Sequence, residues 1–359
     1  MRIACIAYLH GSGGAERQIV TLANGLLERG HEVHLVVLHT NNPRYAIDPD
    51  VIVHDLTYAE CGAGNRIPAR YWALRRCLTN LTPDATVHFW MQSAYFAAMM
   101  PERVRGRAVY SERGDPGDDE YSGLLGLVRW AAFKKMSGFV FQTEAARDHF
   151  SDSVRCRSAV IPNPVIIPDD LLSRDTLVRE TRVVSIGRLA PQKNQFLLLE
   201  AFSLVVRRFS SYELWIYGEG ELREALIERA RQLHILDRFK IIEPCYDVLD
   251  QIKNASLFVL SSSYEGMPNA LLEAMALGLP CVTTDFAPCG AAASIVKDGL
   301  DGLVVSSDPQ SLANAMCSLL EDAKLASALG DNARETAEGY SPKRIFSLWD
   351  NFLRNVVDM

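Results

Sequence analysis

The chain has 359 residues, of which 48% are hydrophobic, and its 37 basic and 44 acidic side chains give a formal net charge of −7. This length exceeds what one hydrophobic core usually supports, so we expect two domains. A small disulfide-stapled scaffold is excluded. The overall acidity argues against a dedicated nucleic-acid-binding protein, which needs a strongly basic surface.

The cysteines and apolar runs indicate the compartment. The eight cysteines are scattered without a Cys-x-x-Cys pair, so the spacing does not favour a metal site. No apolar run reaches the roughly 18 residues of a membrane span, and the first apolar stretch is too short for a secretory signal. We predict a cytoplasmic protein that can rest on a membrane face without crossing it, and no bound metal.

In chain order, short β-branched apolar runs alternate with longer segments of helical periodicity. A strand at Arg2–Leu9 precedes a helix at Ala15–Arg29, which Gly30 ends. Further strands are expected at Glu32–His39 and Ala85–Phe89. This alternation predicts repeated βα units and a mostly parallel sheet.

A glycine-rich loop joins the first strand to the first helix and reads His10-Gly11-Ser12-Gly13-Gly14-Ala15-Glu16-Arg17. Such a loop lets backbone N–H groups approach a phosphate closely. Its spacing does not fit the dinucleotide fingerprint, and no Walker lysine follows. A tight turn without a ligand is an equal alternative.

The segment 65–80 predicts a helix rich in basic and aromatic residues. Its candidate membrane- or lipid-binding residues are Arg66, Arg70, Trp72, Arg75 and Arg76. Cationic and aromatic groups at helical spacing can lie on an anionic membrane. A solvated helix face with Trp72 turned into the core is the alternative. Further basic groups flank Trp130, namely Arg129, Lys134 and Lys135.

Three prolines between Ile161 and Pro168 prevent a continuous helix or central strand and mark a domain boundary. We predict an N-terminal domain at 1–161, a linker at 162–181 and a second domain at 182–340. A C-terminal helix at 341–359 is expected to pack back towards the N-terminal domain. Its core within Pro342–Val357 places Ile345, Leu348, Trp349 and Phe352 on one face.

The second domain repeats the strand–loop–helix pattern. A strand at Val183–Gly187 is followed by Arg188 and Lys193 and then by a helix at Asn194–Phe209. Two cations at one sheet edge suit a diphosphate, although both could simply solvate a loop. Gly218-Glu219-Gly220-Glu221-Leu222 forms a second close backbone approach at the same edge.

A strand at Leu257–Leu260 then leads into a serine-rich loop and a helix that starts near Pro268. Glu265 lies just before this helix, and Glu273 lies about two helical turns further on a similar side. The helix start offers an anion site flanked by carboxylates that can hold sugar hydroxyls. Two solvated glutamates are the alternative for such a pair taken alone.

Taken together, these motifs resemble the retaining GT-B glycosyltransferases with a glycosyl-transferase group 1 C-terminal domain. The resemblance rests on five elements in the family's order. They are the Gly-Gly-Ala-Glu-Arg loop, the Pro-Asn-Pro linker, the Gly-Arg-Leu…Lys-Asn block at 187–194, Gly-Glu-Gly-Glu-Leu at 218–222 and Glu265-x7-Glu273. The match is strongest at 182–305. It is similar to bacterial transferases of lipid-linked oligosaccharides and surface polysaccharides.

The resemblance implies an α/β fold of two Rossmann-like domains with mostly parallel sheets facing a deep cleft. It implies a catalytic set of Arg188, Lys193 and Glu265. The donor-binding residues would be Gly13, Gly14, Gly187, Gly218, Glu219, Tyr246, Gly266, Met267, Pro268, Asn269, Ala270 and Glu273. On the acceptor side it implies His10, Glu112 and Arg113.

The family's chemistry implies metal-independent transfer of a hexose or N-acetylhexosamine with retention of configuration. The donor would be a nucleotide diphosphate sugar, with UDP-sugar favoured, and no other cofactor. The acceptor would be a glycan hydroxyl, carried on a polyprenyl pyrophosphate at the cytoplasmic membrane face. A nucleotide-sugar epimerase and a catalytically silent binding subunit are the alternatives; nucleic acid is not an expected partner.

Two departures from the family pattern change what can be carried over. Arg113 stands where many relatives have a histidine after Ser-Glu, so a histidine role near the donor sugar is not transferred. The segment 289–296 lacks the acid that relatives carry near the position of Ser294. We therefore expect a differently charged acceptor side and an altered donor preference.

Overall fold

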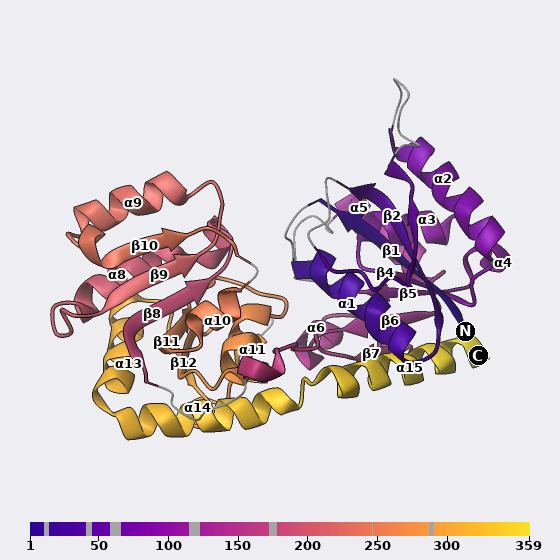
Figure 1. Cartoon of the computed structure of the whole chain (residues 1–359). Coiled ribbons are helices and arrows are strands. Elements are labelled where there is room, and N and C mark those ends of the chain that lie inside the picture. Colours follow the sequence, from indigo (N-terminus) through magenta and orange to yellow (C-terminus); the bar gives the residue numbers. More distant parts are fainter. Residues whose placement is uncertain are drawn as a thin grey trace. The chain divides into compact units, whose positions relative to one another are not determined.

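The chain folds into two compact units, each built around its own parallel sheet (Figure 1). The computed structural model describes residues 1–10, 14–40, 45–57, 66–114, 123–171, 178–245, 247–286 and 291–359. The first unit combines Met1–Pro164 with Pro342–Met359, and the second is Val165–Ser341. Most of the segment expected as a linker is therefore counted with the second unit.

The first unit holds a seven-stranded sheet in the order β3-β2-β1-β4-β5-β6-β7, with neighbouring strands parallel. Its strands are β1 (Arg2–Leu9), β2 (Glu32–Thr40), β3 (Ile52–Asp55), β4 (Ala85–His88), β5 (Arg107–Ser111), β6 (Gly138–Phe141) and β7 (Ser158–Val160). Its helices are α1 (Gly14–Glu28), α2 (Arg66–Leu81), α3 (Met91–Ala98), α4 (Glu102–Arg105), α5 (Gly123–Phe133), α6 (Glu144–Asp148), α7 (Asp152–Arg155) and α15 (Pro342–Asp358).

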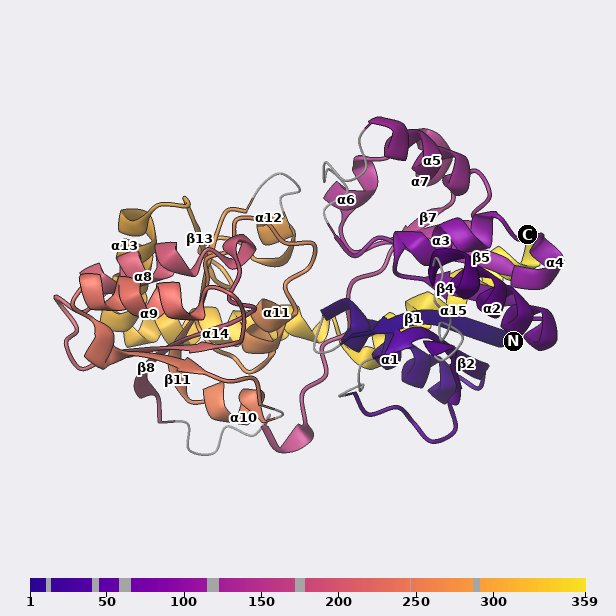
Figure 2. The same ribbon diagram turned by 90° about the horizontal axis from the view of Figure 1, so that it is seen from above.

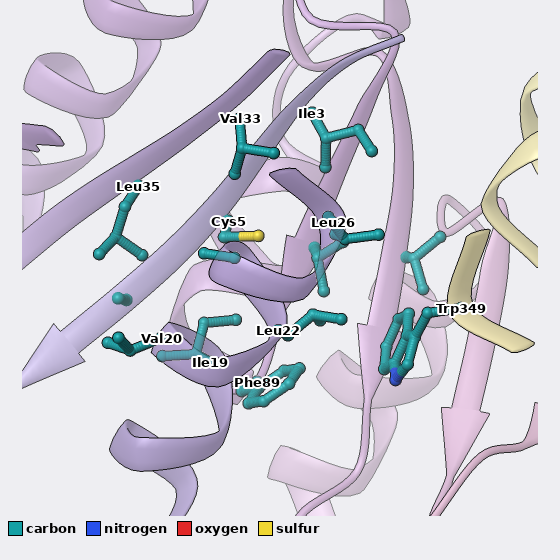
Figure 3. Close-up of a cluster of buried hydrophobic side chains, with 14 of the residues drawn as sticks. Ile3, Cys5, Ile19, Val20, Leu22, Leu26, Val33, Leu35, Phe89 and Trp349 are labelled. Carbon is teal, nitrogen blue, oxygen red and sulfur yellow. The ribbon is translucent and has the colours of Figure 1, made fainter. Parts of the chain in front are cut away.

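Strand β1 buries side chains on both faces of this sheet, because helices cover both sides. Alternate residues such as Cys5 and Leu9 join one hydrophobic cluster with α1 and α15, shown in Figure 3. Ile6, between them, joins a second cluster with Leu74 and Leu78 of α2. The period of two along the strand thus divides the core between two helical layers.

Helix α15 completes the first of these clusters. Trp349 is 2% exposed, and its ring centroid lies 6.3 Å from that of Phe89 (Figure 3). Nε2 of His31 lies 2.9 Å from Oδ1 of Asp350. Leu348, expected on the buried face, is 37% exposed. The prediction for Leu348 was wrong because the buried stripe follows positions 345, 346, 349, 353 and 356 instead.

The second unit holds a six-stranded sheet in the order β10-β9-β8-β11-β12-β13, also parallel (Figure 1). Figure 2 shows this unit from above. Its strands are β8 (Glu180–Ile186), β9 (Glu213–Tyr217), β10 (Phe239–Ile242), β11 (Ala255–Leu260), β12 (Cys281–Thr284) and β13 (Leu303–Val305). Its α-helices are α8 (Gln195–Val205), α9 (Arg223–Gln232), α10 (Val248–Ile252), α11 (Asn269–Ala276), α12 (Ala291–Ile295), α13 (Pro309–Glu321) and α14 (Ala323–Glu338). Single 3-10 turns are η3 (Asp169–Leu171), η4 (Pro191–Lys193) and η5 (Leu236–Arg238).

Two hydrophobic clusters lie on the two faces of this second sheet. Val184 and Phe258 pack with α11 and α14, whereas Val183 and Leu257 pack with α8, α9 and α13. The predicted helix at Asn194–Phe209 is shorter in the structure. Asn194 has a φ of 47°, in the left-handed region, so the regular helix starts only after it.

Within the described ranges, no helix is both long enough and apolar enough to span a bilayer.

Candidate functional site

The strand order of the second sheet reverses at β8, which lies between β9 and β11. Open parallel sheets bind ligands at such a switch point, beyond the carboxyl ends of the strands. The segment that starts at Gly187 follows β8, and the segment that starts at Ser261 follows β11. The two segments therefore leave the sheet from neighbouring strands at the switch point. They are the segments that carry the predicted catalytic residues Arg188, Lys193 and Glu265.

An ion pair joins the two segments. The Lys193 ammonium contacts Oε1 of Glu265, and only 18% and 7% of the two side-chain surfaces are exposed. Ser262 Oγ donates a hydrogen bond of 2.6 Å to the same Oε1. A shielded carboxylate is thus satisfied by a cation and a hydroxyl. The sequence predicted separate ligand contacts for Lys193 and Glu265 but not their pairing.

Hydrogen bonds fix the two segments against each other. The Ser263 amide donates to the Gln192 carbonyl over 2.8 Å, and the Gln192 side chain donates to the Tyr264 carbonyl over 3.0 Å. Ser261 Oγ donates to the Lys193 carbonyl over 3.0 Å. These bonds hold the ion pair in one geometry before a ligand arrives, as a preorganised site requires. The role of Gln192 was not predicted from the sequence, because a glutamine in a loop does not by itself indicate a site.

Two glycines allow the ends of β8 and β9 to come close. A Cβ on Gly218 would lie 2.0 Å from the carbonyl oxygen of Gly187, so no larger residue fits there. A Cβ on Gly187 would lie 3.1 Å from Cε of Lys193, which shows that the lysine stem crosses this glycine. Both predicted donor-binding glycines therefore shape the site, and their contact with a donor stays a prediction.

The second predicted cation, Arg188, is exposed next to the ion pair. Its Nη2 donates to Oε1 of Gln192 over 3.3 Å, and its carbonyl accepts a hydrogen bond of 2.7 Å from Gln195. Because Gln192 is a neutral partner, this contact leaves the charge of the guanidinium in place to attract an anion. Glu219, which follows β9, is exposed as well.

Helix α11 follows Glu265 and starts at Asn269. Pro268 was expected in the first helical turn, but it precedes the helix with an extended ψ of 93°. Glu273 is buried in α11, with 7% of its surface exposed, and Met267 is 8% exposed. Gly266 and Ala270, like Asn269, are partly exposed. Both glutamates are thus shielded from solvent, Glu265 in the loop before α11 and Glu273 within the helix.

Two predicted donor-binding residues, Gly13 and Tyr246, lie outside the described residues. Gly14 is the first residue of α1 and is exposed.

In the first sheet the strand order reverses at β1, between β2 and β4. The His10 ring, just beyond β1, lies 4.8 Å from the His39 ring and stacks on Tyr8 at 5.9 Å. The Trp90 ring, just beyond β4, lies 5.6 Å from Tyr8. Aromatic side chains therefore cluster at this switch point. Of these residues, only His10 was predicted from the sequence as a site residue.

Glu112 and Arg113 have contacts inside the first unit. Glu112, 4% exposed, accepts hydrogen bonds of 3.1 Å from the Tyr110 hydroxyl and from the Arg113 amide. The Arg113 guanidinium lies 3.8 Å from the centre of the Phe89 ring and donates to Asn163 Oδ1. Burial lowers the pKa of Arg113 to about 9. These contacts give Arg113 a packing role at the Pro-Asn-Pro segment, and an acceptor contact stays a prediction.

Helix α2 divides the candidate membrane residues between different faces. Trp72 is 60% exposed, which excludes the alternative that it points into the core, and Arg76 is also exposed. Arg75 lies 5.3 Å from the Trp72 ring, whereas Arg70 turns towards Tyr8, 5.9 Å from that ring. The side chain of Arg66 lies outside the described part. The described basic side chains of α2 therefore do not form one continuous face.

Across the described residues, no group of three or more His, Cys, Asp or Glu side chains is arranged to hold a metal ion.

Two family models match consecutive parts of the chain. Residues 12–167 match the model described as Glycosyltransferase Family 4, and residues 174–336 match Glycosyl transferases group 1. Each match covers most of one structural unit.

Curated relatives align along nearly the whole chain. One is the GalNAc-alpha-(1->4)-GalNAc-alpha-(1->3)-diNAcBac-PP-undecaprenol alpha-1,4-N-acetyl-D-galactosaminyltransferase of Campylobacter jejuni, 25% identical over 99% of both chains. Another is the amylovoran biosynthesis glycosyltransferase AmsD of Erwinia amylovora, 23% identical over 96% of this chain and 97% of its own.

A solved structure, HepE of Anabaena in complex with UDP and glucose, is similar with a TM-score of 0.81 and 17% identity. It covers 99% of this chain and 100% of its own. This likeness confirms the predicted GT-B fold.

Proposed function

We propose a specific sugar transfer for this chain, which belongs to the GT-B glycosyltransferases that join a family 4 domain to a group 1 domain. It moves a hexose or N-acetylhexosamine from a UDP-sugar to a hydroxyl of a lipid-linked glycan. The transfer retains the anomeric configuration, needs no metal ion and serves the assembly of a surface polysaccharide or glycan.

The observation that carries this proposal is the Lys193–Glu265 pair beside Arg188 at the switch point of the second sheet. Sugar transfer places growing negative charge on the leaving diphosphate, and fixed cations at that position lower the barrier. Among the described residues the side-chain partner of Arg188 is the neutral Gln192, and its guanidinium can supply forked hydrogen bonds to a phosphate. Lys193 adds a second positive charge from the same loop.

Glu265 holds hydroxyls of the donor sugar through its carboxylate oxygens. Its Oε1 is already engaged by Ser262 and Lys193, which orients the carboxyl group for a sugar. The same contact keeps the carboxylate next to the cation that meets the diphosphate. The Lys193–Glu265 ion pair then contacts both the sugar and the diphosphate of the donor.

In the reaction, the bond between the anomeric carbon and the diphosphate oxygen breaks as the acceptor hydroxyl oxygen bonds to that carbon on the same face. The hydroxyl proton passes to the leaving phosphate oxygen. No protein base is assigned, because the leaving group itself takes the proton.

The acceptor binds at the first unit, where His10, Tyr8 and Trp90 gather beyond β1 and β4. Aromatic faces pack against the apolar faces of sugar rings, as amphipathic rings do at other interfaces. The names of the Campylobacter and Erwinia relatives, which give an undecaprenol-linked glycan and amylovoran, support a glycan acceptor. Contact of the enzyme with the cytoplasmic membrane face belongs to the same proposal.

The first experiment is a thermal-shift panel of nucleotide diphosphates and nucleotide sugars, with and without a metal chelator. A ligand that binds only the folded chain raises its melting temperature by mass action. We expect one UDP-sugar to stabilise the protein in chelator. Stabilisation by another nucleotide, or a response abolished by the chelator, would overturn the donor or the metal-independence assignment respectively.

The selected donor is then incubated with a lipid-linked glycan, and the product linkage is read by NMR. Retention predicts the same anomeric configuration in product and donor, so an inverted linkage contradicts the mechanism. Conversion of the donor without an acceptor would indicate an epimerase. Binding without any conversion of donor or acceptor would indicate a silent subunit.

A further inference from the structure

Three neighbouring strand ends of the second unit contribute to one series of polar contacts. Strands β8, β11 and β12 lie next to one another in the sheet (Figure 1). Lys193 lies in the segment after β8 and Glu265 in the segment after β11, while Thr284 is the last residue of β12. Thr284 carries no charge and belongs to none of the motifs that the sequence singles out. Any role for it has to come from its contacts.

The hydroxyl of Thr284 holds the main chain of Ser262. Thr284 Oγ1 donates a hydrogen bond of 2.8 Å to the Ser262 carbonyl, and both residues are fully buried. A buried carbonyl without a partner is unfavourable, so this bond restricts where the Ser262 carbonyl can lie. Ser262 is thereby held in one position at the end of β11.

Ser262 in turn orients Glu265. The Ser262 hydroxyl donates to Glu265 Oε1 over 2.6 Å, and the Lys193 ammonium contacts the same oxygen. Oε2 of Glu265 has no hydrogen-bond partner among the described residues. Because Oε1 is occupied, Oε2 is the carboxylate oxygen that can accept a hydrogen bond from a ligand.

These contacts run from β12 to the oxygen that is left for a ligand. Glu265 is buried like Ser262 and Thr284, and hydrogen bonds are electrostatically stronger in such an environment than in water. A shift of Ser262 would move its hydroxyl and turn the carboxyl group about its contact with Lys193. The direction in which Oε2 points therefore depends on Thr284.

We propose that Thr284 is a positioning residue for the sugar of the donor. Its hydroxyl acts through Ser262 and keeps Oε2 of Glu265 directed at a sugar hydroxyl. The diphosphate is bound by Arg188 and Lys193, so its binding does not depend on this direction. The inference rests on the proposed function, because that function assigns Glu265 to the donor sugar.

The test compares the binding of a UDP-sugar with that of UDP, which has no sugar for Glu265 to hold. The probe is UDP-glucose or UDP-N-acetylglucosamine, whichever raises the melting temperature of the unaltered chain more. Isothermal titration calorimetry measures the affinity of the full chain for this probe and for UDP.

Thr284→Val replaces the hydroxyl by a methyl group of similar size and leaves the Ser262 carbonyl without its partner. We expect the affinity for the UDP-sugar to fall about tenfold, as when one buried hydrogen bond is lost, and the affinity for UDP to stay unchanged. Thr284→Ser keeps the hydroxyl and should restore the binding. Thr284→Ala makes the same comparison if valine prevents folding.

Thr283→Val is the matched control. Thr283 is the preceding residue of β12 and is also fully buried, but its Oγ1 donates to the Thr284 carbonyl over 3.2 Å. The control removes a buried hydroxyl from the same strand without releasing the Ser262 carbonyl. It should bind both ligands like the unaltered chain, and thermal unfolding checks that each variant is folded. An equal loss in the two threonine variants, or a loss for UDP as large as that for the UDP-sugar, would overturn the proposal.

A double-mutant cycle tests the route through Ser262. Ser262→Ala removes the hydroxyl that orients Glu265 and should weaken binding of the UDP-sugar but not of UDP. Adding Thr284→Val to this variant should cause no further loss, because Thr284 acts through the hydroxyl that is already absent. Additive losses would show that Thr284 acts by another route and would contradict the proposal.

The same measurements separate this inference from the proposed function. An unaltered chain that binds neither UDP nor a UDP-sugar contradicts the proposed donor and, with it, the role of Thr284. If the unaltered chain transfers sugar and the Thr284→Val variant keeps normal affinity for the UDP-sugar, only the positioning role is wrong and the proposed function stands.

Discussion

Lys193 is the residue on which the proposed chemistry depends most. It is paired with Glu265 and crosses Gly187, so its ammonium is fixed at the switch point. A cation in a fixed position stabilises a developing phosphate charge without reorganisation, whereas a mobile surface lysine does not.

We therefore predict that Lys193→Ala lowers kcat by about 10²- to 10³-fold, the usual cost of removing one fixed electrostatic contact. Lys253→Ala is the matched control, because Lys253 also forms an ion pair in the second unit, 2.6 Å from Asp250. Steady-state transfer assays compare the two variants after thermal unfolding shows that both are folded. Near-normal kcat in the Lys193 variant would remove its catalytic assignment.

His88 at the end of β4 makes a separate prediction about pH. The side chain is fully buried, and burial lowers its pKa to about 3, with Arg105 adding a smaller effect. In the unfolded chain a histidine titrates near its ordinary pKa of about 6.5. Below pH 6.5 the unfolded state therefore binds a proton that the folded state excludes until about pH 3.

The free energy of unfolding should fall by up to about 1.4 kcal/mol per pH unit from this group as pH drops below 6.5. Denaturant unfolding between pH 7 and pH 5 measures the slope. His88→Gln should flatten it, while His149→Gln at the surface should not. His31 and His54, whose pKa values burial also lowers, will leave a residual slope. An unchanged slope in the His88 variant would contradict the assignment.

Among the elements, α15 packs closely against α1 across a large sequence separation. A Cβ on Gly25 would lie 2.4 Å from the ring of Phe346, which is itself 5% exposed. The absence of a side chain at Gly25 thus lets α15 dock against α1. This contact couples the last helix of the chain to the first.

We predict that Gly25→Ala destabilises the first unit by about 1–3 kcal/mol, the usual cost of overpacking. Adding Phe346→Leu should recover part of that loss, because a smaller side chain makes room for the new methyl group. A double-mutant cycle of unfolding free energies measures the coupling. Strictly additive effects would show that α15 does not rest on Gly25.

At the scale of the whole molecule, the second unit is one continuous segment, whereas the first needs both ends of the chain. The two ends of the second unit lie together, because the Val165 amide donates to the Tyr340 carbonyl over 2.9 Å. Adjacent termini favour independent folding of such a segment.

The fragment 165–341 should therefore fold alone and keep the proposed nucleotide binding. Circular dichroism and a thermal shift with the nucleotide chosen by the full chain test this expectation. A truncation to residues 1–341 removes Trp349 and the other α15 members of its cluster and uncovers the rest of the cluster, so we expect it to be insoluble or strongly destabilised. If the fragment 165–341 folds but does not bind the nucleotide, part of the donor site must lie in the first unit.

The sequence alone predicted the βα alternation, the two-sheet architecture and the GT-B family, because hydrophobic periodicity and turn residues act locally. It also singled out Lys193 and Glu265 as chemically important. Their ion pair, the bond from Ser262 and the fit of Gly218 against Gly187 depend on which strand ends become neighbours. The order of the strands in the sheet decides which strand ends are neighbours, and local sequence patterns do not show that order.

Burial was decided by tertiary structure in the same way. Leu348 and Trp349 are adjacent apolar residues, yet only Trp349 enters the core, because docking selects one stripe of α15. The contacts of Arg113 with Phe89 and Asn163 likewise depend on packing between segments far apart in the sequence. Local propensities determine which elements form, and only long-range packing decides which of their faces remain available for function.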